Sequence, residues 1–296
     1  GEGALDNPTG TVTVEGTSLG YGPTQFERGF LQAELKDHVL HIMDGYLGYR
    51  KSRYTLEGHI GLDDVTDMDV QAKAQDVRIE DIMPSVADIP VTGWLDTELR
   101  LQGTWKDPVL RGHLKAWDGS IYGKLYESIE GDYFYEGDTL FLPRLEMHTY
   151  GGTIVADGQV SKEHVDVNFS GDDLPVEPFI RDTGVDLKGY ITTRGHLGGT
   201  LDLPIFEGTV LAPEMHSKDS VLQDVMGSVY ITPNIVNLQE LSFTGAGNSR
   251  YDIKGGVQLT GEKRLFGYVR VEDGDVHQLL SLGNVQIPDL NGKLRG

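Results

Sequence analysis

Apolar and polar residues alternate with a period of two along most of the chain. In the run Val165-Asp166-Val167-Asn168-Phe169, the three apolar side chains share one face of an extended strand and the polar ones take the other. The same alternation places two further sets on one face each: Val70, Ala72 and Ala74, and Leu95, Leu99 and Leu101. Turn sequences separate such runs, among them Glu136-Gly137-Asp138 and Thr260-Gly261-Glu262. The pattern predicts antiparallel strands joined by hairpins, in a sheet with one apolar and one solvated face.

The runs recur with a period of just under one hundred residues. Each repeat begins at a proline, Pro8, Pro108 and Pro204, at spacings of 100 and 96. Three further marks follow in the same order: a glycine before an alternating run (Gly29, Gly131, Gly227), an apolar pair (Leu40 and Ile42, Leu140 and Leu142, Val236 and Leu238) and a second glycine (Gly58, Gly158, Gly255). We therefore predict three repeats, residues 1–107, 108–203 and 204–296, the last truncated, with about six strands each.

Each repeat also contains one short helical pattern, between its fifth and sixth strands. The three patterns are Val77–Met83, Val176–Ile180 and Val276–Leu280. In the first, the spacing puts Ile79, Ile82 and Met83 on one stripe. This favours a helix that closes one end of the sheet, and a helix that docks a partner is the alternative.

A sheet of about 18 strands cannot stay flat, so its apolar face must be covered or curled. The helical patterns are too short to cover it, which leaves three sandwich domains or one long trough. No linker precedes Pro108 or Pro204, and this favours repeats fused edge to edge. We predict an all-β fold, an elongated, curled antiparallel sheet that forms an open hydrophobic groove, extending roughly 85 Å along the hydrogen-bonding direction. Such a groove suits acyl chains, which need apolar area rather than precise polar contacts.

The predicted contact surface consists of the apolar alternate positions of the three repeats. They are Leu40, Ile42, Tyr54, Leu56, Ile60, Val70, Ala72, Leu95, Leu99, Leu101, Leu140, Leu142, Ile154, Ala156, Val160, Val165, Val167, Phe169, Ile191, Val236, Leu238, Tyr251, Ile253 and Val257. The choice of this face as the concave one follows from its polarity alone.

Charge and composition exclude several classes of function. The 46 acidic and 25 basic residues give a formal charge of −21, which disfavours nucleic acid and anionic membrane surfaces as partners. The chain has no cysteine, so disulfides and thiolate chemistry are absent. No run approaches 18 apolar residues. Because the chain starts without Met and stops within the repeating pattern, we expect it to be a segment of a longer protein.

Candidate chemical groups do not form a convincing site. His38 and His41 point to opposite faces of a strand. The acidic cluster Asp63, Asp64, Asp67 and Asp69 lacks the glycine of a calcium loop and favours a solvated turn. Asp172 and Asp173 precede the second helical pattern, where capping explains them. The sequence predicts no metal, no cofactor and no enzymatic activity.

Three tryptophans, Trp94, Trp105 and Trp117, lie around one repeat junction. Packing at the seam is the favoured interpretation. A carbohydrate-binding platform on a parallel β-helix is the alternative, but that architecture repeats about every 20 to 25 residues.

The junction sequences resemble the TamB and AsmA-like family of bacterial envelope proteins. The resemblance rests on residues 93–123, GWLDTELRLQGTWKDPVLRGHLKAWDGSIYG, and on a second copy at residues 189–208, GYITTRGHLGGTLDLPIFEG. In that family a Gly-x-Leu strand, an L-x-L-x-G strand end, a short turn with Pro and another Gly-x-Ile/Leu strand recur along a very long chain. A third copy, Asn291-Gly292-Lys293-Leu294, is cut off by the end of the sequence.

The resemblance implies a β-taco groove in the periplasm, within a parent protein anchored to the inner membrane. It implies a bridge that carries phospholipids between the inner and outer membranes, with an outer-membrane barrel partner of the Omp85 kind bound through regions outside this segment. A scaffold for outer-membrane protein assembly is the alternative that the same groove allows.

Overall fold

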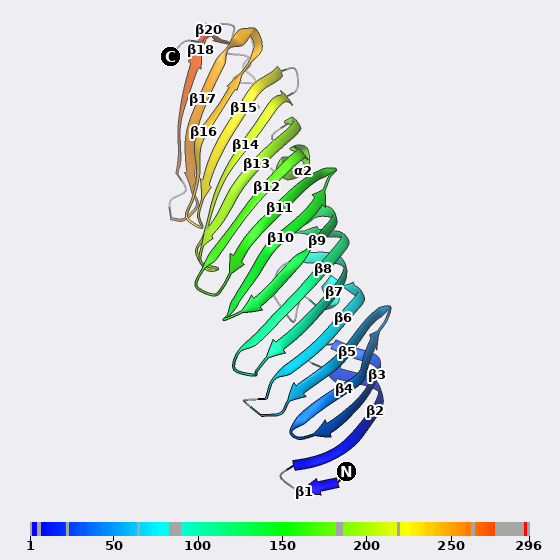
Figure 1. The fold of residues 1–296 in the computed structure, drawn as a ribbon. Helices are drawn as coiled ribbons and strands as arrows, with labels where there is room; N and C mark the ends of the chain where they lie inside the picture. Colours follow the sequence, from blue (N-terminus) through cyan, green and yellow to red (C-terminus); the bar gives the residue numbers. More distant parts are fainter. Residues whose placement is uncertain are drawn as a thin grey trace. The chain divides into compact units, whose positions relative to one another are not determined.

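The computed structural model describes residues 2–4, 7–21, 24–63, 66–82, 90–181, 186–217, 220–261, 264–275 and 293–294. The chain divides into two compact units, Gly1–Met147 (unit 1) and His148–Gly296 (unit 2), with the boundary near the end of strand β10. Strands dominate both units, and the helices are short (Figure 1). The predicted all-β class is confirmed.

Unit 1 is an antiparallel meander, in which each strand pairs with its neighbour in the sequence. Its strands are β1 (Glu2–Ala4), β2 (Asn7–Tyr21), β3 (Thr24–Lys36), β4 (Val39–Tyr49), β5 (Ser52–Gly61), β6 (Met68–Arg78), β7 (Val91–Gly103), β8 (Pro108–Ile121), β9 (Lys124–Glu136) and β10 (Thr139–Thr149).

Unit 2 continues in the same manner. Its strands are β11 (Gly152–Val160), β12 (Val165–Pro175), β13 (Lys188–Gly199), β14 (Pro204–Ser217), β15 (Ser220–Ile231), β16 (Ile235–Thr244), β17 (Arg250–Gln258) and β18 (Leu265–Glu272), followed by the two-residue strands β19 (Gly274–Asp275) and β20 (Lys293–Leu294), which pair with each other.

Hairpin turns join most neighbouring strands. Between β9 and β10, Gly137 and Asp138 both have positive φ, 56° and 61°. Two successive positive φ angles match the twist of the flanking strands, which is why a Gly-Asp pair suits this turn. The turn predicted at Glu136-Gly137-Asp138 is confirmed, and residues 262–263 of the other predicted turn lie outside the described residues.

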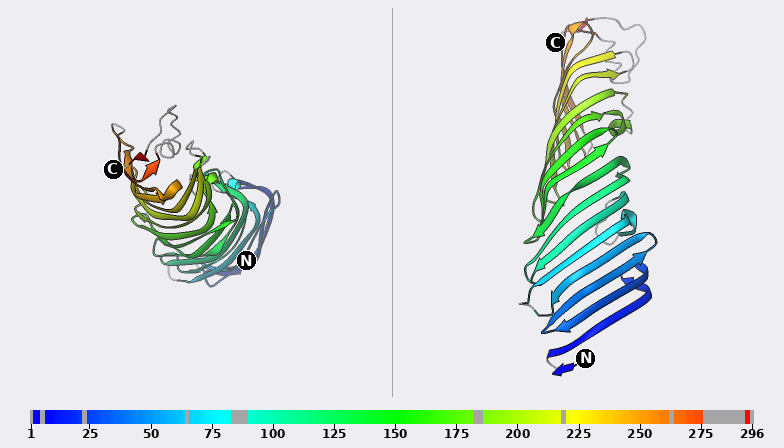
Figure 2. Two further views of the ribbon diagram at one scale, coloured as in Figure 1. Left: turned by 90° about the horizontal axis from the view of Figure 1, so that it is seen from above. Right: turned by 45° about the vertical axis from the view of Figure 1, so that its right-hand side comes forward.

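β-Bulges interrupt the pairing at similar depths along several strands. In β6 the register shifts between Ala74 and Val77, and in β12 between Gly171 and Leu174. A bulge adds one residue to one strand, which bends it and increases its twist. The strands of each unit are curved rather than flat (Figure 2).

Two short helices follow the fifth strands of the first two predicted repeats. They are α1 (Ile79–Ile82), after β6, and α2 (Glu177–Ile180), after β12. The first helix begins two residues later than predicted, because β6 continues to Arg78 and keeps Val77 paired with Leu95. The third helical pattern, at 276–280, lies outside the described residues.

The capping role predicted for Asp172 and Asp173 is wrong. The residue at the N-cap of α2 is Val176, and no side chain caps this helix. Asp173 instead has a φ of 53° and lies within the bulge of β12. Aspartate tolerates this left-handed conformation better than most residues, which explains its presence there.

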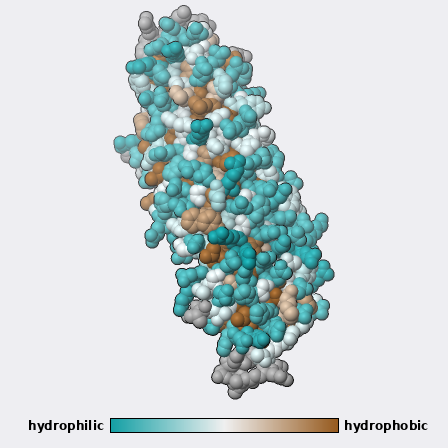
Figure 3. Space-filling model, in the orientation of Figure 1, coloured by the Kyte–Doolittle hydropathy of each residue, from teal (hydrophilic) through white to brown (hydrophobic). Residues whose placement is uncertain are grey.

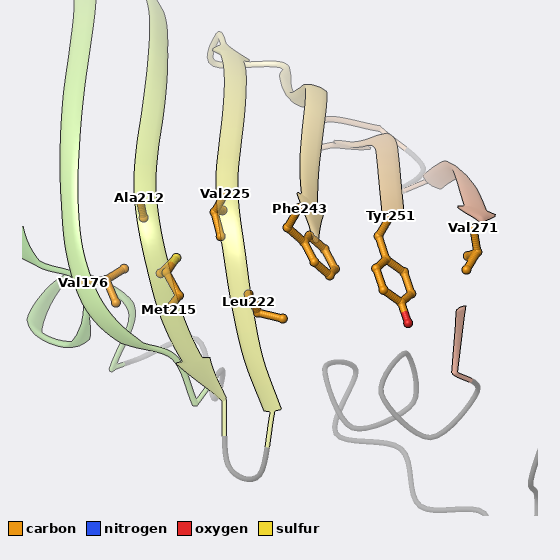
Figure 4. Close-up of a cluster of buried hydrophobic side chains, with 8 residues drawn as sticks. All are labelled: Val176, Ala212, Met215, Leu222, Val225, Phe243, Tyr251 and Val271. Atoms are coloured by element: carbon orange, nitrogen blue, oxygen red, sulfur yellow. The ribbon is translucent and has the colours of Figure 1, made fainter. Parts of the chain in front are cut away.

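The tightly packed cores lie at one end of the strands, beside the helices. In unit 1, Ile79 of α1 packs with Ala116 and Tyr126. The Tyr126 hydroxyl donates a hydrogen bond to the Thr92 carbonyl oxygen at 2.7 Å, and burial, with the Glu80 charge, raises its pKa to about 12. The corresponding cluster of unit 2, shown in Figure 4, consists of Val176, Ala212, Met215, Leu222, Val225, Phe243, Tyr251 and Val271.

The pairing of the strands excludes two other β architectures, a parallel β-helix and a two-sheet sandwich. All pairs with a defined register are antiparallel, so a parallel β-helix is wrong. Each unit has its long strands in one sequentially paired sheet, so a two-sheet sandwich within a unit is also wrong.

Candidate functional site: the apolar face of the sheet

The two faces of unit 1 differ sharply in chemistry. One row of cross-strand partners runs over β3 to β8 as Leu31, Gly45, Leu56, Ala72, Leu99 and Gly112. A row on the opposite face runs over β5 to β9 as Thr55, Lys73, Glu98, His113 and Asp132. We call the first side the apolar face and the second the polar face. This separation follows from strict alternation, because neighbouring residues of a strand point to opposite sides.

Unit 2 has the same two-sided character. A row of cross-strand partners from β12 to β17 is hydrophobic throughout: Val167, Leu197, Phe206, Ile231, Val236 and Val257. On the same face Phe169 and Phe206 stack with their ring centroids 5.4 Å apart. The apolar face of unit 2 thus continues from its end cluster along the strands.

The apolar face of unit 1 is hollowed between β3 and β7. The hollow has a volume of about 510 Å³, which is within the usual range for small-molecule sites. Leu31, Leu47, Leu56, Ala72 and Leu99 are among the residues that line it. The end cluster closes over only part of the face, so these side chains remain partly exposed.

The predicted contact residues all lie on the apolar faces. Ile42, Val70, Val165 and Tyr251 are buried, and the others are partly buried. For Leu140 and Leu142 the face follows from Phe141 between them, which stacks on Phe134 of the polar face with centroids 4.5 Å apart. Tyr251 and Ile253 belong to the packed end of unit 2. The role of this set in binding lipid stays a prediction.

Four of the predicted residues line the hollow itself: Tyr54, Leu56, Ala72 and Leu99. The predicted contact set omitted Leu31, Leu47 and Ala74, although the alternation already placed Ala74 on the same face as Ala72. Leu47 was missed because a bulge between Ile42 and Gly45 shifts the alternation by one residue. After the bulge the odd-numbered positions of β4 face the same side as the even-numbered Leu40 and Ile42. Leu31 and Ala74 lie in alternating runs and were detectable.

The polar face carries ion pairs between neighbouring strands. Lys73 Nζ lies 2.8 Å from Glu98 Oε1, and Arg100 Nε donates to Asp69 Oδ1 at 2.7 Å. His113 Nδ1 lies 2.7 Å from Asp132 Oδ1. Figure 3 shows a face of the molecule on which hydrophilic residues predominate, with isolated hydrophobic ones among them. Such a face is suited to solvent, while the opposite face is not.

We predict that Arg100→Gln raises the pKa of Asp69. The hydrogen bond from the Arg100 guanidinium is the main reason that this pKa lies below its ordinary value, and Gln102 contributes another. Because the folded-state pKa is lowered, the interaction stabilises the fold above the ordinary carboxyl pKa and is lost as the pH falls through the lowered value. Carboxyl ¹³C NMR during an acid titration measures the shift. Arg111→Gln, on the neighbouring strand, is the control and should leave the Asp69 pKa nearly unchanged; an equal shift in both variants would contradict the assignment.

The candidate metal ligands do not converge. His41 pairs across the strands with His59, at a ring-centroid distance of 6.0 Å, and Asp63 accepts a turn hydrogen bond from the Thr66 backbone N–H at 2.6 Å. Asp64 lies outside the described residues. Within the described ranges, no three His, Asp or Glu side chains are grouped to hold one metal ion.

The three tryptophans are not one packed cluster. Trp94 and Trp117 are direct cross-strand partners and are partly buried. Trp105 is 57% exposed at the turn after β7, where its indole N–H donates to the Gly61 carbonyl oxygen at 2.7 Å. The packing interpretation therefore holds for the first two, and Trp105 instead links the turn after β7 to the end of β5.

Among the helices of the described ranges, none has the length and apolar character to cross a membrane. No protein-family model, no curated protein and no solved structure matches the chain.

Proposed function

We propose that this chain is a segment of a lipid conduit, whose apolar face holds phospholipid acyl chains. The observation that carries the proposal is the hollow of unit 1, with its apolar lining on β3 to β7 and charged residues on the reverse of the same strands. Burying a methylene group in such a site contributes about 0.8 kcal/mol and requires no specific polar partner. A sliding hydrocarbon chain can therefore be bound at many successive positions.

The proposed groove is built from three equivalent repeats. Support comes from Asp76, Asp173 and Asp273, which have nearly identical positive φ angles of 52°, 53° and 53° at spacings of 97 and 100 residues. The contacts around them also recur, since the Ser52 hydroxyl donates to the Asp76 carbonyl oxygen and the Ser249 hydroxyl to that of Asp273, both at 2.9 Å. Equivalent bends in successive repeats are what a curled, continuous trough requires.

The biological setting follows from the resemblance to TamB and AsmA-like proteins. On this proposal the chain lies in the periplasm of a diderm bacterium, within a parent protein anchored to the inner membrane. It carries phospholipids toward the outer membrane and contributes to the biogenesis of that membrane. A barrel partner of the Omp85 kind binds elsewhere in the parent protein.

The second candidate function is a scaffold that holds nascent outer-membrane strands. The feature that favours it is strand β18, whose only pairing among the described strands is with β17. Its Tyr268 and Val269 are 54% and 46% exposed on opposite faces. A strand that is paired along one edge only can accept an extended peptide along the other edge by β-augmentation.

Site-specific photo-crosslinking separates these candidates. We predict that a benzoylphenylalanine at Leu56, which lines the hollow, captures phospholipid in diderm cells. The same group at Glu57, the exposed neighbour on the polar face, is the matched control and should capture several-fold less. Mass spectrometry of the recovered protein identifies the adduct.

Equal lipid capture at both positions would contradict a lipid-binding apolar face. Cross-links from position 56 to polypeptide, with none to lipid, would favour the scaffold.

A further inference from the structure

Two arginines converge on one tyrosine on the polar face of unit 1. The guanidinium carbons of Arg28 on β3 and Arg53 on β5 lie 5.6 and 5.5 Å from the centroid of the Tyr46 ring on β4. Arg28 Nε also donates a hydrogen bond to the Tyr46 hydroxyl oxygen at 3.1 Å. Gly48 is the cross-strand partner of both arginines, so it lies between them.

The glycine is required for this arrangement. A Cβ atom at position 48 would lie only 2.5 Å from the Tyr46 hydroxyl oxygen and 3.3 Å from Arg28 Cγ. The phenol group therefore rests directly over the Gly48 backbone, in the space that a side chain would occupy. Three polar groups from three strands thereby meet above one residue.

Within the part of the chain that the structure describes, no carboxylate pairs with the two arginines of this cluster. Elsewhere in unit 1, Arg78 pairs with Glu80 at 2.7 Å and Arg100 pairs with Asp69. By contrast, neither Arg28 nor Arg53 forms an ion pair with any described residue, although the chain has 46 acidic side chains. Both side chains are exposed. Two exposed guanidiniums without a carboxylate partner among the described residues therefore lie against one tyrosine ring.

We propose that Arg28, Tyr46 and Arg53 form a binding site for a phosphate group. A guanidinium presents several N–H donors in a planar fork that matches phosphate oxygens. The Tyr46 oxygen accepts from Arg28, which leaves its own proton available for donation to the same anion. The exposed Lys51, at the turn between β4 and β5, adds positive charge at the same end of these strands.

The two arginines lie on the face opposite the proposed acyl groove, although Tyr46 is also among the residues that line the hollow. Its ligand can be a soluble phosphate ester or the headgroup of a phospholipid in a bilayer, and the recognition chemistry is the same for both. The two sources differ in that only the phospholipid presents its phosphate at the surface of a bilayer.

The test is a titration of the intact chain at low ionic strength with glycerol 3-phosphate, followed through the arginine Nε–Hε NMR signals. We expect saturable shifts of the Arg28 and Arg53 signals. The double variant Arg28→Gln/Arg53→Gln should weaken binding at least about tenfold, since two charge-assisted hydrogen-bonding groups are lost. Tyr46→Phe should weaken it by a smaller factor.

The matched control is Arg111→Gln/Arg194→Gln, which removes two other exposed arginines without ion pairs to described residues and changes the net charge equally. The affinity of this control variant for glycerol 3-phosphate should lie within about twofold of that of the unchanged protein, after correction for the weak long-range effect of the lost charges. Equal weakening in the two double variants, or no saturable shift at Arg28 and Arg53, would overturn the proposal. Backbone spectra confirm that each variant is folded.

A second arm distinguishes the ligand sources, using vesicles of phosphatidylglycerol and phosphatidylcholine in a flotation assay. Vesicle binding that requires Arg28 and Arg53 supports the site with a lipid headgroup as its ligand. Binding of glycerol 3-phosphate without vesicle binding supports the site with a soluble ligand. If the protein binds neither glycerol 3-phosphate nor vesicles, the proposed site is overturned.

Discussion

Replacing Gly158 by alanine is expected to destabilise the fold by about 2–4 kcal/mol. Gly158 on β11 has a φ of +152°, and a Cβ atom there would lie 2.1 Å from the backbone carbonyl oxygen of Asp166 on β12. The substitution therefore combines an unfavourable backbone conformation with a clash that a side-chain movement cannot relieve. Urea unfolding followed by circular dichroism measures the change in the free energy of unfolding.

Gly227 supplies the control for this prediction, because it is another glycine of the predicted repeat pattern and lies in the same unit. A Cβ atom there would meet nothing closer than Leu241 Cδ1, at 3.6 Å, which is an ordinary contact. Gly227→Ala should change the free energy of unfolding by less than about 1 kcal/mol, and restricting the unfolded chain can even stabilise the protein slightly. If both variants lose the same stability, close backbone approach is not the reason that Gly158 is a glycine.

The largest loss of stability is expected from Phe243→Ala, at about 3–5 kcal/mol. Phe243 is 5% exposed in the end cluster of unit 2 and stacks on Tyr251 with ring centroids 4.8 Å apart (Figure 4). Removing the ring loses its burial and leaves a cavity that the neighbouring strands cannot close fully. The free energy of unfolding, obtained from the midpoint and the slope of urea unfolding, measures this loss.

The matched variant is Phe266→Ala, on β18 of the same unit. Phe266 is 50% exposed on the polar face, so its removal should cost less than about 1 kcal/mol. A comparable loss from both phenylalanines would mean that the end cluster does not dominate the packing of unit 2.

A one-sided sheet can leave part of its apolar face free when its packing is concentrated elsewhere. The tight packing is concentrated at the helix-bearing end of the strands, around Ile79 in unit 1 and Val176 in unit 2. Strand pairing and these end clusters hold the sheet together, so the middle of the face does not have to be filled for the fold to form. A partly exposed hydrophobic surface of this kind is unusual in a protein that has no partner for it, and it is the basis of the proposed acyl-chain site.

The local order of residues is enough to predict the strands, the side of the sheet on which each alternating run lies, and the place of the first two helices. Val165, Val167 and Phe169 share a face in the structure as the alternation predicts, since a period of two is a property of any extended strand. The hairpin at Gly137 and Asp138 was equally predictable, because these residues tolerate the positive φ angles that the turn requires.

Features that depend on contacts between strands could not be predicted in this way. The bulge after Ile42 reverses the alternation of β4 and brings Leu47 into the hollow, and no local pattern signals that shift. Asp173 precedes a helix as a cap would, but it forms part of a bulge, since it lies where the register between β12 and β13 shifts. Likewise Arg28, Tyr46 and Arg53 are ordinary surface residues in the sequence, and they meet because cross-strand register places them around Gly48. Alternation is local and can be read along one strand, whereas register is a relation between strands and is settled only when they pair.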